Sequence, residues 1–77
     1  EVVAGKIIEM FIEDKKIDRF ENFYKVKIKP ENREDINAIL DQLAIEKHHL
    51  MKGGVPDVVR TCVRIIKDWQ EGNLRLK

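Results

Sequence analysis

The 77 residues of this chain carry 15 basic and 14 acidic side chains, for a formal net charge of +1. A chain of this length folds as one domain and buries only roughly 60% of its unfolded surface, which leaves little room for a deep catalytic cleft. The single cysteine, Cys62, excludes an internal disulfide and a cysteine-based metal site, and no apolar run approaches the roughly 20 residues of a membrane span. We therefore expect one small domain with a cytoplasmic location and no membrane partner.

The first two predicted helices are amphipathic. In residues 2–16, helical spacing relates the apolar side chains Val3, Ile7, Ile8, Phe11 and Ile12. A shorter pattern of one or two helical turns follows, with the apolar positions Ile17, Phe20 and either Phe23 or Tyr24. Both segments predict helices that pack one face on a core.

The next stretch, YKVKIKP, alternates apolar residues with lysines. Tyr24, Val26 and Ile28 recur with a period of two, which is typical of a strand. The chain contains no second strand for it to pair with, however. We therefore expect an extended connector around residues 24–29 that presses its apolar side chains onto the helices and ends at Pro30.

A third helix is predicted within residues 32–50. Asn32 is a suitable N-cap, and Asp35, three residues later, resembles the second member of a capping box. The apolar stripe that follows consists of Ile36, Ile39, Leu40, Leu43 and Ala44.

A fourth helix is predicted from Pro56, in its first turn, to a stop at Gly72. Its expected buried face consists of Val59, Cys62, Val63, Ile66 and Trp69. The opposite face carries Arg60, Arg64 and Lys67. The whole chain is thus predicted to be an all-α bundle of three to four helices.

The loop HLMKGGVPD leads into this last helix and allows two interpretations. Helix N-termini expose unpaired N–H groups that attract phosphate, Gly53 and Gly54 let a ligand approach the backbone, and Lys52 adds a charge. Alternatively, the two glycines simply turn the chain, and Asp57 would repel an anion. The sequence leaves both interpretations open, with the plain turn favoured.

Positive charge is concentrated around this loop. From Lys47 to Lys67 there are five basic residues and one acid, Asp57. His48 and His49 add to the excess if protonated, and as adjacent helical residues they diverge too far to hold one metal ion. Such a cluster suits a polyphosphate backbone. The predicted RNA contacts are Lys47, Lys52, Gly53, Gly54, Arg60, Arg64 and Lys67.

Much of the chain resembles a known family. The second half of the chain resembles the C-terminal helical domain of the YlqF/RbgA-type circularly permuted ribosome-assembly GTPases. The residues that carry the resemblance are Leu43, Ala44, Met51, Lys52, Gly53, Gly54, Asp57, Asp68, Trp69, Gly72 and Leu74. The preceding helix and its Tyr24 and Val26 step are similar too. The pair His48 and His49 replaces the Arg-Gly of that family, Asn73 a common Lys, and Arg75 a glycine.

The resemblance implies that residues 1–77 are the C-terminal domain of a larger GTPase, with GTP and Mg bound upstream and no cofactor here. It implies docking on ribosomal RNA during assembly of the large subunit. The chain has no G-x-x-x-x-G-K-S/T loop and no nucleophile–base pairing, so we expect no catalysis by it. A second hypothesis is a protein-interaction or regulatory domain that docks on its own GTPase domain, favoured by the strand-like connector without a partner.

Overall fold

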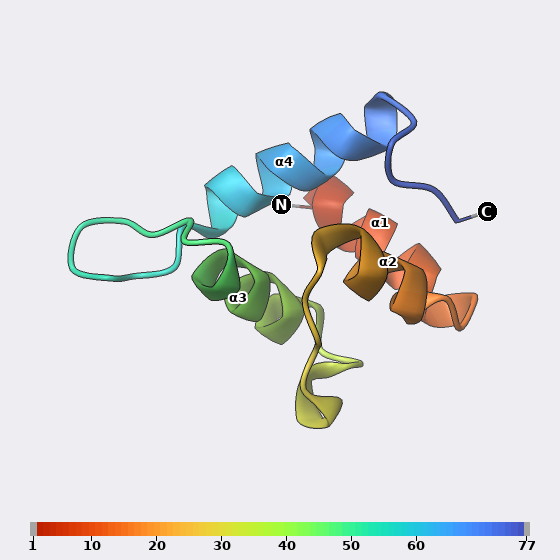
Figure 1. The fold of residues 1–77 in the computed structure, drawn as a ribbon, viewed down its shortest axis with the longest axis horizontal. Helices are drawn as coiled ribbons and strands as arrows, with labels where there is room; N and C mark the ends of the chain where they lie inside the picture. Colours follow the sequence, from red (N-terminus) through yellow and green to blue (C-terminus); the bar gives the residue numbers. More distant parts are fainter. Residues whose placement is uncertain (1, 77) are drawn as a thin grey trace.

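The computed structural model describes residues 2–76. Its elements are α1 (Val2–Glu13), α2 (Ile17–Tyr24), the short 3-10 helix η1 (Pro30–Asn32), α3 (Ile36–Glu46) and α4 (Val58–Gln70). Helix α1 packs against each of the other three α-helices, and the loop between α3 and α4 projects away from them (Figure 1). No strand occurs within residues 2–76, which confirms the predicted all-α bundle.

One apolar cluster holds the helices together. Phe11 lies within it, with its ring centroid 5.7 Å from that of Phe20 and 6.2 Å from that of Trp69. Burying one such side chain contributes roughly 1.5–3 kcal/mol. Its buried members are Ala4, Ile7, Ile8, Phe11, Ile17, Phe20, Tyr24, Ile28, Ile39, Leu40, Leu43, Cys62, Ile65 and Leu74. Within residues 2–76, none of the helices combines the length and the apolar character that crossing a membrane requires.

The buried face of α4 differs from the predicted one. Val59 and Val63 are 62% and 60% exposed, although the sequence pattern placed them in the core. The side chains that α4 buries are Thr61, Cys62, Ile65 and Asp68. The helix is rotated relative to the prediction because the polar members of this set find hydrogen-bond partners inside the fold. These hydrogen bonds offset the cost of removing the polar groups from water. A smaller correction applies to α1, where Val3 is exposed and Ala4 is buried.

The start and end of α3 also differ from the prediction. Its N-cap is Asp35, whose carboxylate accepts the Ala38 N–H at 3.2 Å, whereas Asn32 belongs to η1 and donates to Gln42 instead. The helix ends at Glu46 and not at residue 50, because His48 takes a left-handed conformation with φ of 58°.

All four α-helices in the described part of the chain end in the same way. A residue with positive φ follows each helix, and its neighbour donates a backbone hydrogen bond back into the last turn, as in His49 N–H to Ala44 C=O at 2.8 Å. Only Gly72, after α4, is a glycine. The other three left-handed residues are Lys15, Lys25 and His48.

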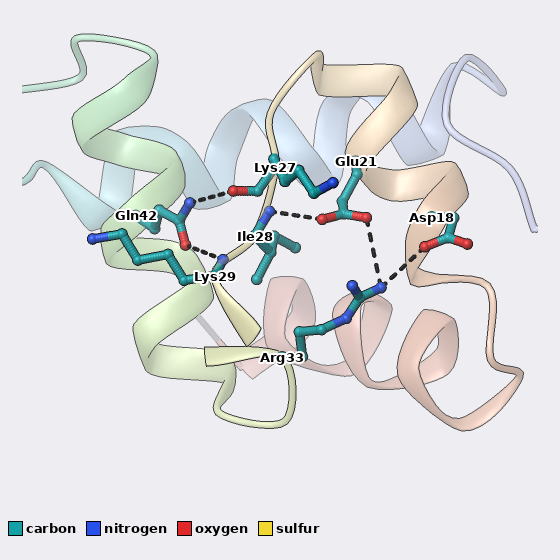
Figure 2. A network of polar contacts seen from close by, with 7 residues as sticks. All are labelled: Asp18, Glu21, Lys27, Ile28, Lys29, Arg33 and Gln42. Carbon is teal, nitrogen blue, oxygen red and sulfur yellow. Dashed lines mark hydrogen bonds and ion pairs between the residues drawn. The ribbon is translucent and has the colours of Figure 1, made fainter. Parts of the chain in front are cut away.

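The connector between α2 and η1 is extended and pairs with no strand in residues 2–76, as predicted. Its backbone groups bond to helix side chains (Figure 2): Ile28 N–H donates to Glu21 at 2.7 Å, and Gln42 donates to Lys27 C=O at 2.7 Å and accepts from Lys29 N–H at 3.1 Å. Three backbone groups of the connector are therefore bonded to side chains of α2 and α3.

Candidate functional site

A hollow of about 290 Å³ lies where the C-terminal ends of α2 and α3 meet the first half of α4. Its floor is apolar, because Tyr24, Leu43 and Ile65 belong to the core. Its full lining consists of Phe23, Tyr24, Lys25, Leu43, Lys47, His49, Thr61, Arg64 and Ile65. We call this the first hollow.

A second hollow of about 350 Å³ lies on the other side of Phe23. It is lined by Arg19, Asn22, Phe23, Asn73, Leu74 and Arg75. Phe23 is 38% exposed and takes part in both linings, so it marks the boundary between the two hollows, which we call the ridge.

Charge is segregated at these hollows. Among the described residues, neither lining includes an Asp or Glu side chain, although the chain as a whole holds 14 acids against 15 bases. The two linings together supply five cations, which are Arg19, Lys25, Lys47, Arg64 and Arg75. The arrangement can attract an extended anion, although Arg64 contributes less than the others because it also pairs with Asp68.

A buried acid lies beneath the first hollow. Asp68 is 6% exposed, accepts the Tyr24 hydroxyl at 2.9 Å and pairs with Arg64 Nε at 3.1 Å. Burial, and then the hydrogen bond to Asp68, raise the pKa of Tyr24, so its hydroxyl remains a proton donor. Asp68 thus joins α2 to α4 and holds one end of the Arg64 guanidinium.

His49 contributes a neutral ring to the same hollow. Its Nδ1 lies 3.0 Å from Thr61 Oγ1, and the Thr61 hydroxyl donates to Asp57 C=O at 3.2 Å. This network assigns the ring proton to Nδ1 and leaves Nε2 as an acceptor. Burial lowers the pKa of His49, and the charges of Arg60 and Arg64 lower it further. The ring therefore adds no charge near neutral pH.

The structure brings together some of the predicted contact residues and separates others. Lys47 and Arg64 line the first hollow, and Arg60 is near enough to act on the pKa of His49. Lys67 is exposed on α4 but lines neither hollow. The remaining predicted residues, Lys52, Gly53 and Gly54, are exposed on the projecting loop (Figure 1).

That loop has the geometry of a turn. Met51 N–H donates to Val55 C=O at 2.7 Å, Gly54 N–H donates to Met51 C=O at 3.0 Å, and Gly53 and Gly54 have φ of 86° and 78°. Asp57, not Pro56, begins the next helix as its N-cap. Its carboxylate accepts the Arg60 N–H at 3.1 Å, so a negative group of the chain itself already occupies the helix N-terminus.

Sequence reasoning did not include Arg19, Phe23, Lys25 and Arg75 in the site. One signal was available for Phe23: adjacent helical residues point about 100° apart, so Phe23 and Tyr24 cannot both face the core. No local pattern relates Arg75 to the other three, since the tertiary fold alone places them at the same ridge.

Residues 2–76 hold no group of three or more His, Cys, Asp or Glu side chains placed to bind a metal ion. No protein-family model, curated protein or solved structure matches this chain, so a function for the two hollows rests on the chemistry of their residues.

Proposed function

We propose that this chain is an RNA-binding domain and that its interface is the pair of hollows around Phe23. The observation that supports the proposal is the group of five cations, without a carboxylate in either lining, around an exposed aromatic ring. Cations attract the phosphates and the ring offers a face to a base, which are the two contacts that proteins commonly make to RNA.

Resemblance to the YlqF/RbgA-type GTPases indicates which class of RNA the domain would bind. On that basis the ligand is ribosomal RNA of the large subunit or its precursor, and the domain serves a GTPase acting in subunit assembly. GTP binding and hydrolysis belong in this proposal to a domain upstream of Glu1, and the 77 residues act by docking alone.

Salt titration of neutralised variants tests the proposal. Fluorescence anisotropy with a structured fragment of large-subunit ribosomal RNA gives affinity at several salt concentrations. Arg19→Gln and Lys47→Gln each remove one phosphate contact, so each should weaken binding and reduce the slope of log K against log salt by about one. Lys52→Gln, the matched control on the projecting loop, should leave the slope unchanged.

Two results contradict this proposal. One is the absence of salt-dependent binding by the unaltered chain. The other is an equal loss of affinity in Lys52→Gln and Lys47→Gln, because the RNA would then not be bound at the hollows but by positive charge in general.

A protein-docking domain is the second candidate. The connector favours it less than the sequence indicated, because Glu21 and Gln42 already bond three of its backbone groups. A different observation does: several large apolar side chains of the loop and α4 are exposed, namely Leu50, Met51, Val55, Val59 and Val63. In this second proposal the partner is the upstream GTPase domain.

The two candidates involve different residues and can be separated. A double variant, Val59→Ser with Val63→Ser, should abolish association with a GTPase domain and leave RNA affinity unchanged if the apolar side chains bind protein. A loss of RNA affinity in this double variant would show instead that the RNA surface extends over α4.

A further inference from the structure

Phe23 differs from the other aromatic residues in its exposure. Of the aromatic rings in residues 2–76, it alone is exposed, whereas Phe11 and Phe20 are fully buried. Its one ring contact is the edge-to-face arrangement with Tyr24, at 4.8 Å between centroids and 83° between planes. A buried position would have stabilised the fold more, because an aromatic side chain gains from losing contact with water.

The surroundings of Phe23 match one nucleotide better than a duplex. The first hollow, at about 290 Å³, is at the small end of ligand pockets, which span roughly 300–1,000 Å³. Its lining combines apolar side chains, which suit a flat ring, with the polar ring of the half-buried His49. Duplex RNA hides its base faces inside the stack, so an exposed ring gains little from a fully paired helix.

Positive charge lies on both sides of the ridge. Lys47 and Arg64 belong to the first hollow, and Arg19 and Arg75 belong to the second. A base placed against Phe23 would therefore have cations on either side for the phosphates that precede and follow it. This geometry fits a strand that crosses the ridge with one base turned inward.

We propose that Phe23 is a stacking platform for an unpaired base, which enters the first hollow while the flanking phosphates bind cations of both hollows. The ligand class is thus RNA with a bulged or single-stranded nucleotide, and not continuous duplex. This inference rests on the proposed RNA-binding function and narrows its ligand.

Two hairpin RNAs test the inference, one fully paired and one identical except for a single bulged adenosine. Base–aromatic stacking predicts that the chain binds the bulged hairpin about 10-fold more tightly. Phe23→Leu should bind the bulged and the paired hairpin with equal affinity, whereas Phe23→Trp should retain the preference for the bulge. A 2-aminopurine at the bulge should lose fluorescence with the unaltered chain, as stacking quenches it, but not with Phe23→Leu.

The outcomes separate the two proposals. Salt-dependent binding with equal affinity for both hairpins overturns the stacking role and leaves RNA binding intact. Full preference for the bulge in Phe23→Leu also overturns the stacking role. The absence of binding to either hairpin overturns the proposed function together with this inference. Thermal unfolding of Phe23→Leu is the control for folding, and Phe23→Trp tests the same point with the aromatic face preserved.

Discussion

Tyr24→Phe tests the link between α2 and α4. The substitution removes one hydroxyl and keeps the ring, so the packing of Tyr24 on Phe20, at 5.0 Å between ring centroids, is preserved. Asp68 loses the donor that lies 2.9 Å from its carboxylate and, at 6% exposure, has little access to replacement water. Arg64 Nε, at 3.1 Å, remains as a partner.

Hydrogen bonds to charged groups contribute roughly 1.5–3 kcal/mol, so we expect Tyr24→Phe to lower the free energy of unfolding by about 2 kcal/mol. In a domain of this size that corresponds to a decrease in Tm of about 8–16 °C. Urea denaturation followed by circular dichroism measures the change.

A double-mutant cycle with Asp68→Asn identifies the interaction. Against the neutral amide, the cost of Tyr24→Phe should fall to about 1 kcal/mol, because a neutral hydrogen bond is weaker. A cost below about 0.5 kcal/mol in the unaltered background would refute the reasoning, since it would mean that water or a shifted Arg64 satisfies Asp68 equally well.

Three further predictions concern single residues. His48→Gly should raise the free energy of unfolding by about 1 kcal/mol in chemical denaturation, since glycine adopts the left-handed conformation without the penalty that His48 incurs. Glu21→Ala should destabilise the fold by roughly 1–3 kcal/mol because Ile28 N–H loses its acceptor, and Glu21→Gln should cost less than half of that; equal costs would contradict the role of the oxygen. The pKa of His49 is lowered in the fold, so below about pH 6.5 the unfolded chain binds the proton more strongly than the folded chain does. The free energy of unfolding therefore decreases as the pH is lowered. Tm measured across this range should show the fall, and His49→Gln should reduce it.

Helical periodicity was sufficient to predict most of the fold. The α3 stripe of Ile39, Leu40, Leu43 and Ala44 is buried as expected, because each of these aliphatic side chains has no polar group that needs a partner. Periodicity failed on α4, where Val59 and Val63 fitted the apolar pattern better than Thr61 and Asp68. The true face is set by the Tyr24 hydroxyl, 44 positions away, which makes burial of Asp68 favourable.

The prediction of helix boundaries was limited in a similar way, because several residues compete for the same capping role. Asn32 and Asp35 are both good N-caps, and local propensity does not decide between them. The choice of Asp35 depends on η1, which starts at Pro30 and is tied to α3 by the bond from Asn32 to Gln42. At the other end, His48 ends α3 in a conformation that is uncommon for any residue except glycine.

The site was only half predictable for a related reason. Lys47 and Arg64 were found because charge excess is visible along the chain. Phe23 and Arg75 were not, because no local pattern relates an aromatic residue of α2 to a basic residue near the end of the chain, and they meet only when Leu74 enters the core.

The buried Asp68 carboxylate also bears on how the interface is held. Tyr24 precedes Lys25 and follows Phe23, so the hydrogen bond from Tyr24 to Asp68 fixes the end of α2 that carries both the proposed stacking platform and one cation. The same carboxylate anchors Arg64, which means that one buried charge positions groups from two helices at the rim of the first hollow. Because Asp68 offsets part of the Arg64 charge, Arg64 should contribute less to the salt dependence of RNA binding than Lys47 does. Asp68 therefore fixes the geometry of the site and at the same time reduces its positive charge. This combination favours binding only if the ligand must be held in one orientation, as a stacked base is.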